Sequence, residues 1–353
     1  MSKIMYIVLI ISGLLGISVF LVLQHPSFGR RMSAERRQRI ESSPNYRDGK
    51  FRNEHPTAQF TGKKSAMETL WGFLTDQSRN RIPTTPVPSE KHDLRQLPAE
   101  DLYVWFGHSS YLVQVAGCRV LVDPVLRMEF PASLMLKPFK GSDIYQPEDI
   151  PNVDYLIITH EHWDHLDYAT LRDLRSKIGK VICPLGVGEY IEYWGFAPDS
   201  IIEMDWYQAW SANDDSLRIT CLPSRHFSNR LLKRDQTLWA SFMLECGGRK
   251  VYIGGDGGYD DRFRRIHEKF ANIDIAFLEN GQYNEDWAQI HTTPQTLAQA
   301  MVDIAADNIV TVHHNKFALA RHPWNEPDSL AREIAGEKNI NLLDSPLGAV
   351  VKF

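Results

Sequence analysis

The segment VDYLIITHEHWDH, residues 153–165, consists of an apolar run followed by closely spaced polar side chains. Its first half is rich in Val, Leu and Ile and predicts a buried β-strand. Its last six residues hold three histidines and one aspartate, namely His160, His162, Asp164 and His165. Imidazole and carboxylate are common metal ligands, and so many of them at the end of one strand indicate a metal site.

Polar side chains of the same kinds follow several other apolar runs. They are Asp123 after RVLV, His226 after TCLPSR, Asp256 after VYIGG, and His313 and His314 after NIVTV. In layered α/β folds, binding sites gather where strands give way to loops, because strands fix the backbone while loops leave side chains free. We therefore expect these residues to share one rim of the fold with residues 160–165.

The spacing within residues 160–165 favours two metal ions. His160 and His162 alternate, so an extended backbone would point both rings to the same side, whereas the adjacent Asp164 and His165 must diverge. One ion would take the two alternating histidines and a third imidazole, and the other would take the adjacent pair and a fourth. Asp256 lies among glycines, which let the backbone pass close by. It is expected to bridge the ions, because a shared anion offsets their repulsion.

The donor types restrict the metal and leave one ligand open. Nitrogen and oxygen donors without a thiolate suit zinc, with iron or manganese as alternatives. The four cysteines lie in or beside apolar runs without CxxC spacing and are expected to be buried, unpaired thiols. His313 and His314 are neighbours on a strand and point opposite ways, so only one of them can face the metals.

Two segments of similar chemical pattern indicate a duplicated hairpin. SYLVQVAGCRVLV (110–122) and SFMLECGGRKVYI (241–253) turn at Ala-Gly and Gly-Gly, respectively. Helical patterns lie between the strand-like runs, for example at 167–179 and 293–307. We expect two packed sheets between helical layers, which is a four-layer αβ/βα sandwich of the α+β or α/β class.

The amino terminus carries an apolar run long enough to cross a bilayer. Residues 4–23 are 20 residues without a charge, and a helix of that length matches a hydrocarbon core of about 30 Å. We predict a transmembrane anchor over 1–24, with a cleaved secretory signal as the alternative. Residues 25–100, rich in Pro, Arg, Ser and Asn, are expected to form a connector with one packed helix at 65–75. Residues 101–353 are expected to form the catalytic domain.

Charge sets expectations for membrane topology and partners. Only Lys3 precedes the apolar run, whereas five arginines follow it: Arg30, Arg31, Arg36, Arg37 and Arg39. Because basic residues near a span tend to stay cytoplasmic, we expect a single-pass membrane protein whose catalytic domain lies in the cytoplasm. The same arginines would suit anionic lipid headgroups, so an extracytoplasmic or periplasmic domain stays an alternative. The net charge of −5 argues against nucleic acid as a partner.

The polar residues at the predicted rim carry a resemblance. The HxHxDH pattern at 160–165, followed by His226, Asp256 and His313, resembles the metallo-β-lactamase superfamily of hydrolases over about residues 100–345. That resemblance implies an αβ/βα sandwich with two metals at one sheet edge. The segments WFGHSSYLVQV, VDPV, RHFSNR, LWASF, GGDGGY and HHNKFALA are similar to N-acylphosphatidylethanolamine-hydrolysing phospholipase D and its bacterial relatives.

The resemblance implies a ligand set residue by residue. It assigns the first zinc ion to His160, His162 and His226, the second to Asp164, His165 and His313, and the bridge to Asp256. His314 falls where the family usually carries a different residue. Asp164 and His291, which the resemblance places near the substrate, are the catalytic residues it implies, and Asp123 would steer a ligand imidazole. The alternative for His291 is a structural histidine bonded to backbone at a helix entry.

The implied reaction is hydrolysis of a membrane phospholipid. Two dications bring the pKa of a water between them to about 7, so hydroxide can attack phosphorus at neutral pH. The products would be phosphatidic acid and an N-acylethanolamine, made at the bilayer by an enzyme that the resemblance also pairs as a homodimer. Three alternatives stay open: a metal-dependent hydrolase of another ester, lactone or amide, a nuclease, and a non-catalytic membrane module stabilised by metal.

Overall fold

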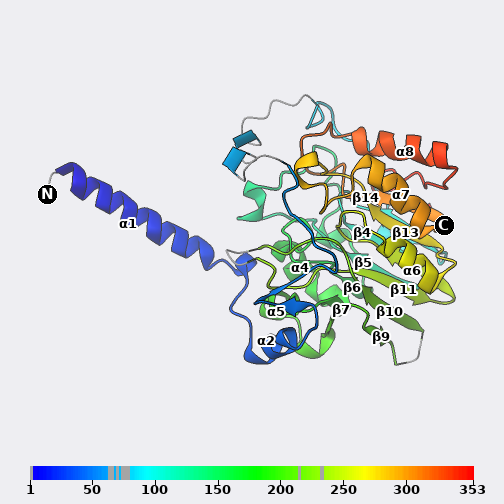
Figure 1. Ribbon diagram of the computed structural model, residues 1–353, viewed down its shortest axis with the longest axis horizontal. Coiled ribbons are helices and arrows are strands. Elements are labelled where there is room, and N and C mark those ends of the chain that lie inside the picture. Colours follow the sequence, from blue (N-terminus) through cyan, green and yellow to red (C-terminus); the bar gives the residue numbers. More distant parts are fainter. Residues whose placement is uncertain (1–2, 63–66, 69–70, 73–79, 214–215, 231–233) are drawn as a thin grey trace.

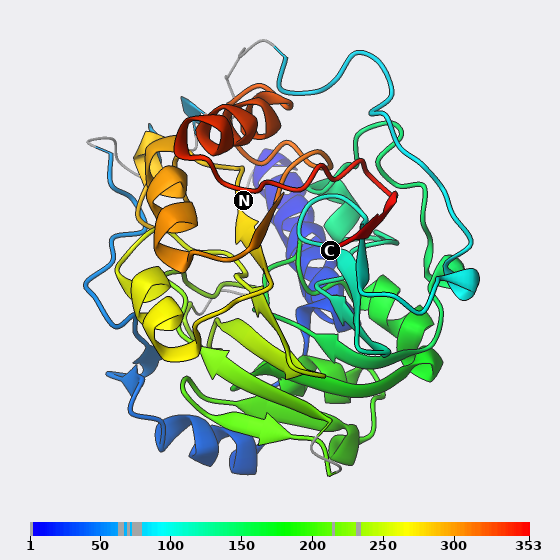
Figure 2. The same cartoon turned by 90° about the vertical axis from the view of Figure 1, so that its right-hand side faces the viewer.

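Two β-sheets packed face to face form the centre of the protein in its computed structural model (Figure 2). The structure describes residues 3–62, 67–68, 71–72, 80–213, 216–230 and 234–353. In order across the first sheet, the strands are Val350–Lys352 (β15), Leu102–Trp105 (β3), Tyr111–Val115 (β4), Cys118–Val122 (β5), Val153–Ile157 (β6), Ile178–Pro184 (β7) and Ile201–Met204 (β8). Across the second they are Asn308–Val312 (β14), Ile275–Glu279 (β13), Arg249–Ile253 (β12), Ser241–Cys246 (β11), Leu217–Leu222 (β10) and Ala209–Ser211 (β9).

The main core lies between the two sheets. Apolar side chains from the facing strands are fully buried there, and the rings of Tyr111 (β4) and Phe277 (β13) stack across the interface with centroids 4.1 Å apart. Cys221 and Cys246 belong to the same core, and none of the four cysteines forms a disulfide, as the sequence predicts. Cys118 is only partly buried, unlike the buried thiol expected there. Burial of this surface supplies the main driving force for folding.

Helices cover the outer face of each sheet. Tyr168–Leu174 (α4) and Gly188–Tyr193 (α5) pack on the first sheet through Leu171, Leu174 and Ile191. Arg262–Phe270 (α6), Pro294–Ile304 (α7) and Glu326–Lys338 (α8) pack on the second, with Ile266 and Leu297 among the buried residues. The result is four layers, helix, sheet, sheet and helix, which confirms the predicted αβ/βα sandwich (Figure 2).

The two predicted hairpins are present, one in each sheet. Strands β4 and β5 pair antiparallel from Val115 opposite Cys118, and β11 and β12 pair from Cys246 opposite Arg249. Both turns have two central residues with positive φ, 48° and 81° at 116–117 and 56° and 82° at 247–248. This backbone conformation matches the twist of the strands and favours glycine.

A long apolar helix stands apart from the four layers (Figure 1). Helix α1, Lys3–Leu23, contains a window at Met5–Leu23 that is long and apolar enough to cross a membrane, and none of that window is buried in the protein. A signal sequence near an amino terminus would pass the same test. The structure therefore confirms the predicted apolar helix.

Residues 25–100 are more than a connector, because much of this segment packs on the catalytic domain. It contains Ala34–Glu41 (α2), Tyr46–Arg47 (β1) and Lys50–Phe51 (β2), and its residues Ile40 and Phe51 enter the main core. The helix expected at 65–75 falls largely outside the described residues. Short 3-10 helices occur here and elsewhere, at Pro26–Phe28, Leu94–Gln96, Ala132–Leu134, Pro147–Asp149, Arg175–Lys177, Pro198–Ser200 and Glu285–Trp287.

Candidate metal centre

The predicted site residues meet at one edge of the two sheets, just beyond the ends of five strands. Asp123 follows β5, residues 160–165 follow β6, His226 follows β10, Asp256 follows β12 and His313 follows β14. Apart from Asp123, the predicted residues contribute to overlapping groups, and within each group the ligand atoms lie within 4.8 Å of one another. The expectation of a shared rim is therefore met by the geometry.

The first group consists of His160, His162, His226 and Asp256. His160 Nε2 lies 2.8 Å from His162 Nδ1, and His226 Nε2 lies 3.2 Å from the same Nδ1 atom. Asp256 Oδ2 lies 3.9 Å from His160 Nε2 and 3.8 Å from His226 Nε2. Three imidazole nitrogens and one carboxylate oxygen form a donor set that suits tetrahedral zinc.

The second group consists of Asp164, His165 and His313, with His108 as a fourth member. Asp164 Oδ2 lies 3.7 Å from His165 Nε2 and 2.8 Å from His108 Nε2. His108 and His313 both have left-handed backbones, with φ of 53° and 74°. Their loops are also joined, because the His313 amide donates to the His108 carbonyl at 2.8 Å. Such strain outside glycine is typical of functional sites.

Asp256 lies between the two groups. Its Oδ2 atom is 3.2 Å from His165 Nε2, and its Oδ1 atom is 3.1 Å from His313 Nδ1, in addition to its contacts with the first group. The neighbouring glycines permit this position. Gly255 has a φ of 58°, and a Cβ added at Gly258 would lie 2.2 Å from the Gln289 carbonyl oxygen. The carboxylate is thus placed where a bridge between two ions would lie.

The protonation states suit cation binding. Burial, together with neighbouring imidazoles, holds the pKa values of His160, His226 and His313 well below the usual range, so these rings are neutral at pH 7. Neutral imidazole is the form that binds metal. Burial alone would lower the pKa of His165, but the carboxylates of Asp256, Asp164 and Asp123 raise it well above normal. A positive charge, whether a proton or a metal ion, is therefore favoured beside these carboxylates.

Two buried polar atoms support the fit of metal ions. In the part of the chain that the structure describes, His165 Nε2 and Asp256 Oδ1 are both buried without a hydrogen-bond partner. Burial of an unsatisfied polar atom costs about 1–3 kcal/mol, so such atoms are rare without a reason. Coordination to a divalent cation would satisfy both atoms. The residues present thus fit metal ions in these two groups.

The ligand groups expected from residues 160–165 are present, but the side chains of Asp164 and His165 do not diverge. His160 and His162 lie beyond the end of β6 at Ile157 and share the first group. The chain then turns, with the His165 amide donating to the His162 carbonyl at 3.1 Å. Asp164 and His165 lie in that turn, and both belong to the second group.

Asp123 orients one of the imidazoles. Its Oδ2 atom lies 2.7 Å from His165 Nδ1 and accepts from Thr159 Oγ1 at 2.6 Å, while its Oδ1 atom accepts from the Thr159 amide at 2.8 Å. A carboxylate behind a histidine fixes which ring nitrogen carries the proton and points the other toward the metal. This is the arrangement expected for a carboxylate that steers a ligand.

His291 lies beside the metal groups and contacts a carboxylate. Its Nδ1 atom contacts Glu279 Oε1 at the end of β13, so the alternative of a histidine bonded to backbone is wrong. Its ring centroid is 5.2 Å from that of His226 and 5.5 Å from that of His313. Burial lowers the pKa of His291, but the carboxylates of Glu279, Asp256 and Asp164 together outweigh that effect, and the pKa is raised.

His314 points away from both groups. Its ring lies 4.8 Å from the Trp105 ring, between centroids, and its Nε2 atom lies 3.4 Å from Thr311 Oγ1. Burial lowers the pKa of His314 to about 4, so the ring is neutral and packs as an aromatic side chain. Of the two adjacent histidines, it is His313 that reaches Asp256.

Two further residues, His108 and Arg230, were not singled out from the sequence. Arg230 is buried, and its Nη1 atom donates to the carbonyls of Glu161 at 2.7 Å and Leu166 at 2.8 Å, which braces the metal-binding loop. Its guanidinium carbon lies 4.1 Å from the centroid of the Trp163 ring. The sequence signal for both was slight, since each is a lone residue in a segment whose partners are distant along the chain.

Two adjoining cavities open beside the metal groups. One, of 240 Å³, is lined by two kinds of residue. The polar ones include His162, Asp164, Asp256, His291 and His313, and the apolar ones are Phe60, Phe227, Trp287, Ile290 and Leu319. The other, of 330 Å³, shares Gln59, Phe227 and Ile290 with it and also borders His226. It is basic, since its lining contains Lys50, Arg52 and Arg234. Both are therefore bordered by the segment at 50–60.

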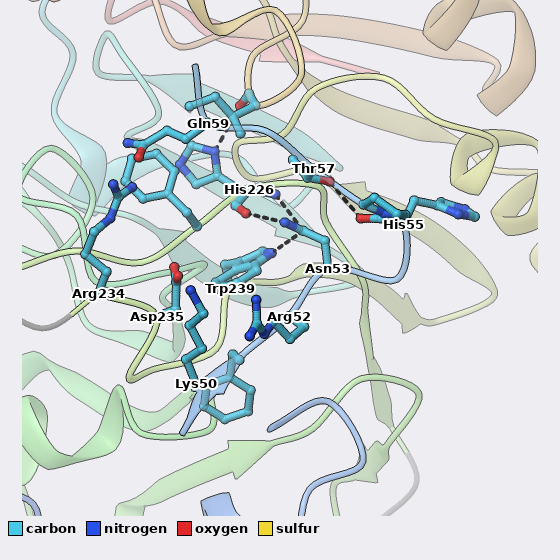
Figure 3. A pocket seen from close by; sticks show the side chains of 14 residues that line it. Lys50, Arg52, Asn53, His55, Thr57, Gln59, His226, Arg234, Asp235 and Trp239 are labelled. Atoms are coloured by element: carbon cyan, nitrogen blue, oxygen red, sulfur yellow. Dashed lines mark hydrogen bonds between the residues drawn. The ribbon is translucent and has the colours of Figure 1, made fainter. Parts of the chain in front are cut away.

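Asn53 connects that segment to a predicted ligand (Figure 3). Its amide accepts from the His226 backbone N–H at 3.1 Å and donates to the His226 carbonyl at 2.8 Å. The Trp239 indole also donates to it at 3.0 Å. The amino-terminal segment thus helps to fix the position of His226.

Comparison with known proteins identifies the family. The β-lactamase superfamily domain model matches residues 118–314, which include all the predicted ligands. One relative is an uncharacterized protein from Mycobacterium tuberculosis, 38% identical over 81% of this chain and 78% of its own length. Another is N-acyl-phosphatidylethanolamine-hydrolyzing phospholipase D 1 from Caenorhabditis elegans, 26% identical over 82% of this chain and 87% of its own length.

A solved structure shares the fold. It is Igni18, a metallo hydrolase from the archaeon Ignicoccus hospitalis, which is 21% identical and aligns with a TM-score of 0.54. The alignment covers 72% of this chain and 98% of Igni18. This likeness shows the architecture alone. Together with the domain match over more than half of the chain, it leads to one conclusion: the protein belongs to the metallo-β-lactamase superfamily and is a metal-dependent hydrolase.

Proposed function

We propose that the protein is a membrane-anchored phosphodiesterase with two zinc ions. Its substrates would be N-acylphosphatidylethanolamine-like phospholipids, which it would cleave to phosphatidic acid and an N-acylethanolamine. One observation carries the proposal: the 240 Å³ cavity is lined both by predicted metal ligands and by apolar side chains. A phospholipid likewise combines a charged phosphodiester, which the metal ions would bind, with acyl chains that suit an apolar surface. The phospholipase relative adds support to this choice of substrate.

The residues of the chain have separate tasks in this reaction. Bound dications would supply hydroxide at neutral pH and offset the charge that grows on the phosphoryl group. Asp123 holds His165 in the orientation that ligation needs. His291, whose protonated form Glu279 stabilises, lines the same cavity as the predicted metal ligands. It would donate a proton to the ethanolamine oxygen as the phosphorus–oxygen bond breaks.

The anchor would bring the enzyme to its substrate. Helix α1 has the length and composition of a membrane span. An enzyme held at a bilayer meets lipid at high effective concentration and need not wait for monomers in water. The side of the membrane on which the catalytic domain lies, and assembly as a homodimer, stay predictions.

The test uses full-length protein loaded with zinc and reconstituted with a bacterial lipid extract that contains N-acylphosphatidylethanolamine, in water enriched in ¹⁸O. We expect mass spectrometry to show loss of that lipid and one ¹⁸O atom in phosphatidic acid, with none in the N-acylethanolamine, because attack occurs at phosphorus. Asp256→Asn is the control, since it removes the bridging charge. Loss of a different ester, lactone or amide would contradict the substrate, and equal product with Asp256→Asn would contradict the metal chemistry.

Metal identity is tested in a separate preparation. Elemental analysis of protein purified without added metal should find two zinc ions per chain. Two iron or two manganese ions would keep the reaction and change the cofactor, because the donors are also compatible with those metals.

A further inference from the structure

A third cavity lies between the end of α1 and the catalytic domain. Its volume is about 830 Å³, within the range of small-molecule sites. It is bordered by Leu23, the last residue of α1, by Arg30, Arg31 and Arg37, by Tyr190 of α5, and by Glu161 of the metal-binding loop. It shares no residue with either cavity beside the metal groups. It is therefore separate from the candidate active site.

Two of the arginines that follow α1 form no ion pair with the residues that the structure describes. Of the five in the sequence, Arg30 pairs with Glu189 at 2.5 Å, Arg36 pairs with Glu203 at 2.6 Å, and Arg39 reaches Glu203 at 3.4 Å. Within the described residues, Arg31 and Arg37 have no carboxylate partner, and both side chains are exposed. The mouth of the cavity thus carries two positive charges that an external anion can meet.

The interior of the cavity combines apolar surface with polar atoms that lack partners. Met32, Ile40 and Tyr46 supply the apolar part. Glu161 Oε2 and Thr237 Oγ1 are buried in residues that border the cavity, without a hydrogen-bond partner in the described part of the chain. A ligand that matches this interior is amphiphilic and also carries hydroxyl groups.

The position of the cavity selects the source of that ligand. Leu23 ends α1, so in a bilayer crossed by α1 the mouth of the cavity lies at the level of the lipid phosphates. Basic side chains just outside a span attract anionic lipids, at about 1 kcal/mol for each. Acyl chains can then stay in the bilayer beside Leu23 while the headgroup enters.

We propose that this cavity binds the headgroup of one anionic phospholipid, with its phosphate at Arg31 and Arg37 and headgroup hydroxyls at Glu161 and Thr237. The proposal rests on the membrane anchor of the proposed function and is independent of the lipid that is hydrolysed. The bound lipid lies next to the metal-binding loop. Glu161 stands between His160 and His162, and Tyr190 contacts Arg230, which braces the same loop, at 5.4 Å.

The test compares full-length wild-type protein with Arg31→Gln/Arg37→Gln in nanodiscs of phosphatidylcholine with a minor fraction of phosphatidylglycerol. Native mass spectrometry counts the lipids that stay bound after release. We expect one phosphatidylglycerol on the wild type and an apparent affinity about thirtyfold weaker in the variant, since two cations are removed. The matched control is Arg47→Gln/Lys338→Gln, which removes two exposed charges outside the cavity and should bind like the wild type.

The outcomes are separable. Equal retention of phosphatidylglycerol by the cavity variant and the wild type would overturn the proposal. Retention of phosphatidylcholine by the wild type to the same extent as phosphatidylglycerol would overturn it too. Displacement of the lipid by millimolar inorganic phosphate would show that the cavity binds free phosphate and would contradict the claim that its ligand is a phospholipid. Failure of the wild type to float with phosphatidylcholine vesicles would instead contradict the anchor on which the proposal rests. Metal content and tryptophan fluorescence check that each variant is folded.

Discussion

Asp123 makes hydrogen bonds that an amide of the same shape cannot all replace. Its Oδ2 atom accepts from His165 Nδ1 and Thr159 Oγ1, and its Oδ1 atom accepts from the Thr159 amide. In Asp123→Asn one of these two oxygens becomes an NH₂ group, which in either orientation would face another donor. We expect the metal affinity of the second group to fall by about 10–100-fold. Competition with a chromophoric chelator measures this affinity directly.

A matched substitution separates that effect from a general loss of charge. Asp199 is an exposed carboxylate on a distant turn, and Asp199→Asn should leave the metal affinity unchanged. An unaltered affinity in Asp123→Asn would contradict the role assigned to this carboxylate.

His291 is expected to act on the substrate and not to hold metal. In His291→Asn we expect kcat to fall by about 10²–10⁴-fold, because a proton donor to the leaving oxygen is lost. Metal content should stay at that of the wild type. His92, an exposed histidine that lines neither cavity beside the metal groups, provides the control His92→Asn, whose kcat should be unchanged.

The competing result for His291 is also defined. Its ring, with Asp256 and His313, forms a third group with donor atoms within 4.8 Å. Loss of one metal ion in His291→Asn would therefore show that His291 is a ligand and contradict its assignment as a proton donor.

At the site, the sequence could predict which residues meet but not how they are held. The clustering in 160–165 and the strand-end positions of His226, Asp256 and His313 carry that information. His108 could not be found in this way, because its place depends on a left-handed backbone and on pairing with a loop some 200 residues away, where the His108 amide donates to the His314 carbonyl at 2.8 Å. Such long-range contacts leave no local pattern.

At the level of elements, α2 is held to the domain by buried charge. Arg36 has a side chain only 10% exposed and pairs with Glu189 and Glu203, which are 3% and 1% exposed. In Arg36→Met these carboxylates lose a buried partner, so we expect the free energy of unfolding to fall by about 3–5 kcal/mol. Denaturant titration in detergent measures it.

The neighbouring arginine is the control for α2. Arg39 has a side chain 49% exposed and reaches Glu203 at 3.4 Å, so Arg39→Met should cost about 0–1 kcal/mol. Equal effects of the two substitutions would contradict the buried network.

The elements of the two sheets were predictable, and those of residues 25–60 were not. The hairpins at 110–122 and 241–253 combine alternating apolar residues with a turn that glycine favours, and α7 begins at the capping residue Thr293 before Pro294. In contrast, α2 and the short strands β1 and β2 are largely polar. They are fixed by single buried residues, such as Ile40 and Phe51, and by ion pairs to distant glutamates.

The loop after β14 contains a buried lysine with a marked dependence on pH. Lys316 is 1% exposed, and its Nζ atom donates to the carbonyls of Phe106 at 3.1 Å and Val125 at 2.8 Å. Burial lowers the pKa of Lys316 from 10.5 to about 8. Between these values the unfolded chain holds a proton that the folded chain has lost. The stability contributed by this group therefore rises as pH rises through that window.

We expect wild-type protein to gain roughly 3 kcal/mol from this lysine between pH 8 and pH 10.5, relative to Lys316→Met. The measurement is the free energy of unfolding of both proteins across that range. The difference between their slopes isolates Lys316 from other groups that titrate there. Parallel curves would contradict the lowered pKa.

For the whole molecule, the arginines after α1 act as parts of the folded domain as well as topology signals. The sequence suggests five charges available to a membrane surface, whereas the structure uses Arg30, Arg36 and Arg39 to pair with glutamates. Only Arg31 and Arg37 are left for lipid among these five. The cytoplasmic orientation predicted from the count therefore needs a direct test, such as protease protection of the domain in sealed vesicles.

The anchor and the catalytic domain should be separable by truncation after Leu23. The cut must leave Pro26 and Ser27, because their carbonyls accept from the Trp194 indole at 2.9 Å and from Arg230 Nε at 2.7 Å, beside the metal-binding loop. Helix α1 itself is not buried in the domain. We expect the truncated protein to hydrolyse a water-soluble phosphodiester within about twofold of the full-length rate, and a vesicle-borne phospholipid about 10²-fold more slowly, since its effective concentration at the bilayer is lost. Equal loss on both substrates would mean that α1 supports the fold, and no loss on either would mean that it does not deliver the enzyme to lipid.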